Sequence, residues 1–307
     1  MKKVLTIIFI TLLVMAGLCG LGYYYQDEIY IYYQEEVLKV KDNITISKND
    51  YYKDNNYEYV QNTDDFIAKD KNHLKNIFYT IINSGTENFT FYCDDNYTNC
   101  TNDVDEMVKD QELLSNINNF VHPFNSFESI STSYDEFGKV VVKIDKVYSE
   151  TEIAATNEVV DKIINSEITN NMSTTKKITT IHDYIINNGK YATDSIRKTN
   201  PNESFNKALD ILAGGYGLCS SYADAMALFL YRFDLDNYKI ASQSHIWNLV
   251  KINNKWLHLD LTWDDPVTST GEDKLDDYFL LIDNDELNEL QVEQHDFDKD
   301  IYKEALN

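Results

Sequence analysis

Basic side chains are scarce in this sequence. Lys and Arg together number 27 against 51 Asp and Glu, which gives a formal net charge of −24 at pH 7. No block of consecutive basic residues is longer than a pair, so a phosphate backbone would be repelled and we expect no nucleic acid partner. The acidic surface would keep the protein soluble, or would concentrate cations and amine-bearing ligands.

Charged residues are also missing from residues 4–21, an apolar run that follows Lys2 and Lys3. Its length is at the lower limit for a membrane-spanning helix, and the two lysines would stay on the cytoplasmic side. The tyrosines at residues 23–25 resemble an interfacial aromatic belt. We therefore predict a membrane anchor or signal segment over residues 1–22, with the body on the extracytoplasmic side of the cell membrane.

Two other fates of this segment stay open. A cleavable signal peptide is the main alternative, because Ala16, Gly17 and Gly20 are small, and the protein would then be secreted. Lipidation of Cys19 is the minor one, because Leu18 is bulkier than the residue that usually precedes a lipidated cysteine.

Cysteine is rare, with four residues in the whole chain. Cys93 and Cys100 enclose a polar loop and could form a disulfide in an oxidising compartment, whereas metal binding by these two thiols is less favoured without a nearby histidine. Cys19 lies in the apolar segment. Cys219 is therefore left unpaired, and a lone thiol in an exported protein is either buried and inert or reactive.

The sequence shows no internal repeat or low-complexity segment, and 43% hydrophobic residues suffice for a core. Residues 23–60 lack sustained periodicity and are predicted to be a stalk or linker. Residues 61–148 are predicted to form a small α/β domain, and residues 149–307 a second domain with leading helices. Periodicity predicts helices over residues 66–82, 104–117, 150–168, 174–187 and 201–214, and strands over residues 89–93, 129–133 and 140–147.

The stretch GGYGLCSSYADAMALFL, residues 214–230, places Cys219 between glycines and an apolar run. The apolar residues recur at helical spacing, and Ser220 or Ser221 can cap the helix, so Cys219 is predicted at a helix N-terminus. The positive end of the helix dipole would stabilise a thiolate there. A buried, unreactive cysteine is the alternative.

Residues 244–250 and 255–261 alternate like two strands and are joined by Asn253-Asn254, which predicts a β-hairpin. With a two-residue loop, Ile252 faces Lys255.

This register places His245, Trp247 and Asp260 on one face of the sheet. The Cβ atoms of His245 and Asp260 would then lie about 7 Å apart, within reach of a bond between imidazole and carboxylate. A three-residue loop would put them on opposite faces. His258 shares the face of Asp260 and is an alternative base.

These residue types in this arrangement indicate nucleophilic catalysis. Asp260 would orient His245, which would take the proton of the Cys219 thiol and return it to a leaving group. The backbone N–H of Cys219 would hold the oxyanion together with a second donor. Tyr191 and Trp247 are weaker candidates for the oxyanion site or the cleft wall, and each could instead be a packed aromatic residue.

Three stretches in this order resemble the transglutaminase-like superfamily: GGYGLCSSYADAMALFL, HIWNLVKINNKWLHLDLTWDDP and DDYFLLID. On the matching positions the family's nucleophile, base and carboxylate are Cys219, His245 and Asp260. IHDYIINNGKYATD also resembles the family's helix and the tyrosine that follows it, at Tyr191. The resemblance covers about residues 174–285.

The resemblance implies a papain-like α+β fold, in which a helix bearing the cysteine packs on an antiparallel sheet that carries the histidine and aspartate. It implies acyl transfer through a thioester on a protein or peptide substrate, which could be associated with the cell wall. Water as acceptor would make a peptidase or amidase, and a lysine amine would make a cross-linking transamidase. No metal or cofactor is required, because the thiolate–imidazolium pair supplies its own activation. The alternative is a non-catalytic surface module for binding or scaffolding.

Overall fold

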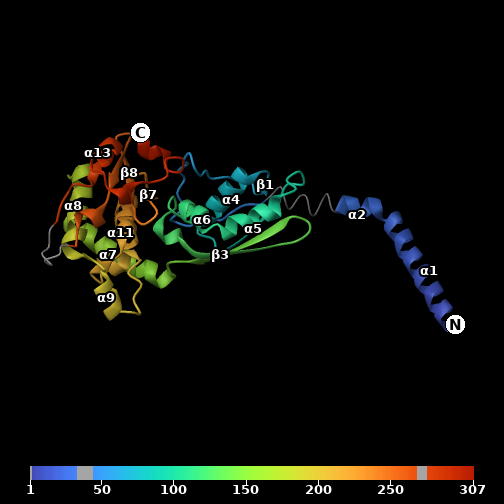
Figure 1. Ribbon diagram of the computed structural model, residues 1–307. Helices are drawn as coiled ribbons and strands as arrows, with labels where there is room; N and C mark the ends of the chain where they lie inside the picture. Colours follow the sequence, from blue (N-terminus) through green and yellow to red (C-terminus); the bar gives the residue numbers. More distant parts are fainter. Residues whose placement is uncertain (1, 33–43, 268–274) are drawn as a thin grey trace.

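The computed structural model describes residues 2–32, 44–267 and 275–307. The chain combines helices with two four-stranded sheets and a two-stranded ladder (Figure 1). It therefore has the mixed α+β character that the sequence predicts.

The chain begins with helix α1 (Lys2–Tyr24) and helix α2 (Gln26–Tyr32). Within the described ranges, no helix is long and apolar enough to cross a membrane, so the segment predicted over residues 1–22 gains no support.

The first sheet has the strand order β1-β2-β4-β3. Its strands are β1 (Ile67–Ala68), β2 (Asn88–Cys93), β3 (Phe127–Tyr134) and β4 (Lys139–Lys146). The strands predicted over residues 129–133 and 140–147 correspond to β3 and β4, which form a hairpin. Gly138 in its turn has a φ of +77°, which glycine adopts without strain. The helices that share a core with this sheet are α4 (Lys71–Ser84), α5 (Cys100–Lys109) and α6 (Gln111–Asn118).

Two of the helices predicted within residues 61–148 have different bounds in the structure. The helix predicted over residues 66–82 starts later, because β1 pairs with β2 and the Asp70 side chain caps α4. The helix predicted over residues 104–117 is broken at Asp110, whose carboxylate accepts the Leu113 N–H. In both places an aspartate side chain binds the backbone and sets a new helix start.

A disulfide joins Cys93 to Cys100, with their Cα atoms 5.9 Å apart. Cys93 ends β2 and Cys100 begins α5, so the bond ties a strand to a helix of the same core.

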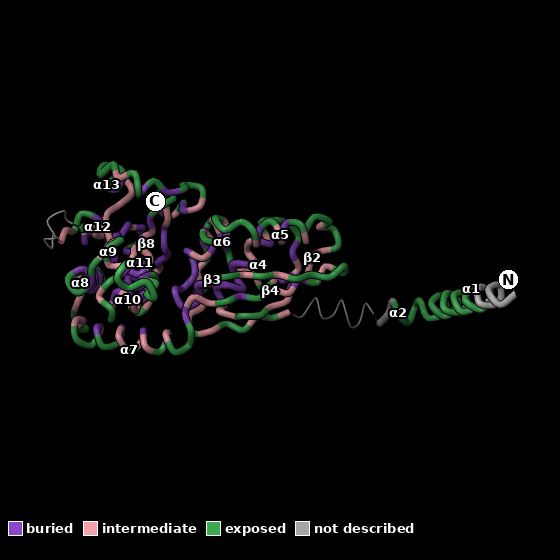
Figure 2. The backbone as a smooth tube through the Cα atoms, turned by 60° about the horizontal axis from the view of Figure 1, so that its bottom comes forward, coloured by how far each residue is buried: buried purple, intermediate pink, exposed green. Residues whose placement is uncertain are grey.

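The second sheet has the order β10-β9-β8-β7 and is antiparallel. Its strands are β7 (Asn237–Ala241), β8 (Ile246–Ile252), β9 (Lys255–Leu259) and β10 (Leu280–Ile282). Helix α11 (Cys219–Arg232) packs on one face and is mostly buried (Figure 2). The Asn248 side chain fixes it there by donating to the Ala223 carbonyl at 2.9 Å. The remaining helices of this half include α7 (Glu150–Glu167), α8 (Thr174–Asn188), α9 (Asp194–Thr199), α10 (Ala208–Leu212) and α13 (Asn284–Glu289).

The other face of the second sheet packs against the first half of the chain. The ring centroid of Tyr238 lies 4.7 Å from that of Phe120 and 5.1 Å from that of Tyr57. Tyr57 belongs to the stretch predicted as a stalk or linker, and its side chain is buried. The two predicted domains therefore bury apolar surface against each other.

A buried ionic contact ties α11 to β7. Lys239 Nζ donates to Asp224 Oδ1 at 2.6 Å, and both side chains are 7% exposed. Tyr148 donates its hydroxyl to the other oxygen of Asp224 at 2.8 Å and accepts the Ala208 N–H at 2.8 Å. Because a buried charge is costly without its partner, this contact constrains how the helix lies on the sheet.

The contact leads to a stability prediction. Asp224→Ala leaves the Lys239 ammonium buried without its carboxylate, and we expect the free energy of unfolding to fall by about 3–5 kcal/mol in urea denaturation. The double variant Asp224→Leu/Lys239→Met removes both charges and should recover most of that loss. Equal destabilisation in the single and double variants would contradict the role given to the ion pair.

Candidate active site

Cys219 is the first residue of α11, as predicted, and its thiol is free and partly buried. Leu218 is the N-cap, so the predicted capping by Ser220 or Ser221 was wrong. The Ser221 hydroxyl instead donates to the Phe205 carbonyl at 2.6 Å. In the described part of the chain the Cys219 backbone N–H has no acceptor, as expected in the first turn of a helix.

The hairpin that carries the histidine and the carboxylate has the predicted register. Asn253 and Asn254 form the two-residue turn with φ of +50° and +64°, and Ile252 pairs with Lys255. Both asparagines adopt the left-handed conformation that this kind of turn requires. The register is therefore confirmed, and it brings the residue before β8 next to the residue after β9.

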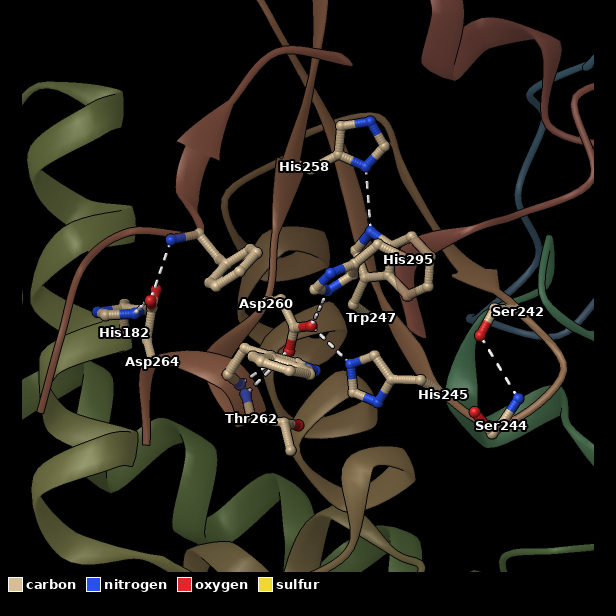
Figure 3. A network of polar contacts seen from close by, with 12 residues as sticks. His182, Ser242, Ser244, His245, Trp247, His258, Asp260, Thr262, Asp264 and His295 are labelled. Atoms are coloured by element: carbon tan, nitrogen blue, oxygen red, sulfur yellow. Dashed lines mark hydrogen bonds and ion pairs between the residues drawn. The ribbon is translucent and has the colours of Figure 1, made fainter. Parts of the chain in front are cut away.

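Those two residues are His245 and Asp260. His245 Nε2 lies 2.6 Å from Asp260 Oδ2, and the side chains are 4% and 2% exposed (Figure 3). The other Asp260 oxygen, Oδ1, accepts the backbone N–H groups of Thr262 and Trp263 at 3.0 and 3.3 Å. Asp260 thus caps a short helix, α12 (Leu261–Asp264), where the sequence predicted a continuing strand.

The electrostatics of the pair favour the charged forms. Burial lowers the pKa of His245, but the Asp260 carboxylate and the Cys219 side chain outweigh it and raise that pKa to about 9. Burial raises the pKa of Asp260, while His245 and His295 lower it to about 2. At neutral pH the site therefore favours an imidazolium beside a carboxylate. Since Nε2 faces Asp260, the other ring nitrogen, Nδ1, is the atom left for Cys219.

Tyr191 lies close to Cys219. It ends strand β5 (Lys190–Tyr191), which runs parallel to β6 (Tyr216–Gly217) and pairs Tyr191 with Gly217. Burial raises the pKa of the Tyr191 hydroxyl, and the nearby Cys219 adds to the effect. The structure therefore brings this predicted residue to the thiol.

Trp247 is a buried wall of the site. Its ring is stacked on that of His245, with centroids 5.6 Å apart and planes at 13°. Its indole N–H donates to His258 Nδ1 at 3.0 Å, so this N–H does not face an oxyanion. The suggestion that Trp247 could donate to the oxyanion was therefore wrong, and a role as cleft wall remains.

His258 does not act as the base in this arrangement. Burial lowers its pKa to about 3, and the nearby His295 adds to the effect. Its Nδ1 accepts the Trp247 N–H, which requires the neutral ring. His258 therefore supports Trp247 and makes no contact with Cys219 in the described structure.

His295 is a residue of the site that the sequence analysis missed. It ends the short helix η3 (Glu293–His295), and its Nε2 lies 2.8 Å from Asp260 Oδ2. No spacing pattern connects it to Asp260, because the segment between them has neither strand alternation nor a turn of fixed length.

Asp264 forms a second buried pair. Its carboxylate is fully buried and bonds His182 Nε2 at 3.0 Å. It also accepts the Phe279 backbone N–H at 3.0 Å. Burial raises the pKa of Asp264. Burial lowers the pKa of His182, but the carboxylates of Asp264 and Asp183 outweigh it and raise that pKa. This second pair anchors α12 to α8 beside the candidate site.

One cluster in the described residues could hold a metal ion, namely His245, Asp260 and His295, whose ligating atoms lie within 4.8 Å of one another. The same atoms make the N···O contacts of 2.6 and 2.8 Å, which is the spacing of charge-assisted hydrogen bonds. The groups thus satisfy one another, and the expectation that no metal or cofactor takes part stays a prediction.

A groove of about 990 Å³ borders the site. One wall consists of Ser242, Gln243 and Ser244, the three residues before His245, and another comes from α6. The carboxylates in its lining are Glu112, Glu293, Asp296 and Asp298. Cys219, His245 and Asp260 are not part of the lining, so the groove lies next to the candidate site and does not contain it.

Comparisons with known proteins agree with the resemblance in the sequence. Residues 162–261 match the family model of the Transglutaminase-like superfamily, and this range contains Cys219, His245 and Asp260. The predicted resemblance is therefore confirmed for this part of the chain.

Two solved structures are similar at low identity. One is described as a TGase, with 14% identity, a TM-score of 0.34, and coverage of 50% of this chain and 48% of the other. The second is a candidate cysteine protease from Cytophaga hutchinsonii, with 12% identity, a TM-score of 0.28, and coverage of 44% and 61%. The chain thus spans about half to three fifths of these proteins. A search of curated proteins gave no match.

The charge coupling in the site can be tested directly. In Asp260→Asn the carboxylate that raises the pKa of His245 is gone and burial dominates, so we expect this pKa to fall from about 9 to below its ordinary value of about 6.5. Titration of the imidazole resonances by NMR measures it. Asp264→Asn is the matched control, since Asp264 bonds His182 and should leave the pKa of His245 unchanged. A His245 pKa that stays near 9 in Asp260→Asn would refute the coupling.

Proposed function

We propose that this protein is a cysteine-dependent enzyme that transfers acyl groups from amide bonds of protein or peptide substrates. The proposal rests on the buried pair of His245 and Asp260, which lie 2.6 Å apart. Nε2 of His245 is bonded to Asp260, so Nδ1 is the ring nitrogen available to the Cys219 thiol at the start of α11. The match of residues 162–261 to the Transglutaminase-like superfamily supports the same chemistry.

The first half of the reaction forms a thioester. His245 takes the thiol proton through Nδ1, and the Cys219 sulfur attacks the acyl carbon. The tetrahedral oxyanion is held by the Cys219 N–H and the Tyr191 hydroxyl. When the C–N bond breaks, the imidazolium gives its proton to the leaving amine. Asp260 keeps the ring oriented and stabilises its charged form throughout.

The second half transfers the acyl group to an acceptor. Water or a primary amine loses a proton to His245 and attacks the thioester carbon, and the Cys219 thiolate leaves. Water makes the protein a peptidase or amidase, and a lysine amine makes it a cross-linking transamidase. Gln243 and Ser244 line the groove beside His245, which makes them candidates for contacting the substrate on this side.

We also propose that the enzyme works outside the cytoplasm, with proteins or peptides of the cell surface or wall as substrates. The Cys93–Cys100 disulfide supports this location, because disulfides persist in oxidising compartments. The apolar residues 4–21 would hold the body at the cell membrane, or would export it before cleavage.

The first test measures alkylation of Cys219 by iodoacetamide against pH in the full chain carrying Cys19→Ser, which removes the other free thiol. Reaction should persist below about pH 7 and should be slowed about 10²-fold by His245→Ala near pH 6, where an ordinary thiol is almost fully protonated. His122→Ala, which alters a buried histidine bonded to the Phe124 N–H, is the control and should react like the parent chain. A thiol that reacts slowly and equally in all three would sink the proposal and favour a binding or scaffold module.

A second test concerns the oxyanion. Tyr191→Phe removes one donor, and we expect kcat for release of labelled peptides from casein, or for incorporation of a fluorescent amine into it, to fall about 10²-fold. Alkylation by iodoacetamide forms no oxyanion and should keep its rate. Tyr216→Phe, on the neighbouring strand β6, serves as control. If Tyr191→Phe slowed alkylation as much as acyl transfer, Tyr191 would be acting on the thiol and not on the oxyanion.

A further inference from the structure

His295 shares one carboxylate oxygen with the proposed catalytic base. Asp260 Oδ2 receives His245 Nε2 at 2.6 Å and His295 Nε2 at 2.8 Å (Figure 3). The two rings reach this oxygen from different parts of the chain, since His245 precedes β8 and His295 ends η3. The His295 side chain is 2% exposed, so water does not substitute easily for either contact.

Aromatic residues fix the orientation of the His295 ring. Its centroid lies 4.9 Å from that of Trp247 with perpendicular planes, 4.8 Å from that of Phe279, and 5.4 Å from that of Trp263. Its Nδ1 is buried and has no hydrogen-bond partner among the described residues. Asp260 is therefore the acceptor that decides the tautomer, and the ring donates through Nε2.

We propose that His295 is a positioning residue that acts through Asp260: its Nε2–H keeps the carboxylate ionised and turned toward His245, and thereby maintains the charged state of the base. The proposal rests on the proposed function, in which His245 activates Cys219.

The physical argument is that a buried carboxylate needs donors to stay charged. Thr262 and Trp263 supply backbone donors to Oδ1, and the two histidines supply donors to Oδ2. Without His295, Asp260 takes up a proton at higher pH. His245 then loses its counter-charge, and the thiolate–imidazolium pair collapses at a higher pH than in the intact protein. Two further titratable groups lie near Asp260 among the described residues. His258 stays neutral because it accepts the Trp247 N–H, and Asp264 bonds His182 instead of either histidine on Asp260.

The test compares His295→Phe, which removes the donor, with His295→Gln, whose amide N–H can replace it. The readout is the pH profile of Cys219 alkylation in the full chain with Cys19→Ser. We expect the acid limb to move up by about one pH unit in His295→Phe, the size of one lost hydrogen bond to a charged group, and to stay near its original position in His295→Gln. His122→Gln, another buried histidine, should lower stability in urea without moving the acid limb.

A spectroscopic readout separates this proposal from the proposed function. The wild-type chain should show downfield imidazole N–H resonances from His245 and His295, in addition to that of His182, which bonds Asp264. The resonances of His245 and His295 should vanish in Asp260→Asn, that of His295 should vanish in His295→Phe, and that of His182 should remain in both variants. If wild-type Cys219 proves unreactive at every pH, the proposed function fails, but the two resonances still report whether His295 binds Asp260. Equal pH profiles in wild type and His295→Phe, or a wild-type spectrum without the His295 resonance, would overturn the positioning role.

Discussion

The candidate site depends on one buried anion, the carboxylate of Asp260. A carboxylate that is 2% exposed is costly unless every lone pair finds a donor. The donors come from three places in the fold: the residue before β8, the first turn of α12, and the end of η3. These segments must converge on Asp260 for it to stay charged, so its solvation constrains the whole end of the second sheet.

Elements defined by local rules could be predicted from the sequence. Asn253-Asn254 favours a two-residue turn, and this turn sets the register that brings His245 to Asp260. The apolar spacing after Cys219 predicts the helix that starts there. The same rules failed at Asp110, where one side chain outweighed helical periodicity, and at Asp260, which begins α12 by capping it.

Residues placed by tertiary packing could not be predicted. His295 reaches Asp260 from a short helix that lacks periodicity of its own, and aromatic rings from three other segments hold it. His258 shares a strand face with the site, yet its neutral ring follows from burial and from the Trp247 N–H, neither of which a pattern reveals. The sequence could therefore identify that His245 and Asp260 meet, but not that His295 joins them or how the charges are distributed.

The distribution of charge distinguishes the two buried carboxylates that follow β9. Asp260 and Asp264 are four residues apart, and each bonds a buried histidine. Burial raises the pKa of Asp260, but its two histidines outweigh burial and lower it. Burial and then the charge of Asp260 raise the pKa of Asp264 despite its bonds to His182 and Phe279. The net charge of −24 does not decide this, because charges farther than about 8–10 Å are screened by salt. Local donors thus make Asp260 the permanent anion, and Asp264 is left to hold α12 in place. An imidazolium at His245 then has its counter-charge on one side only, which leaves the opposite ring nitrogen free to exchange a proton with the thiol.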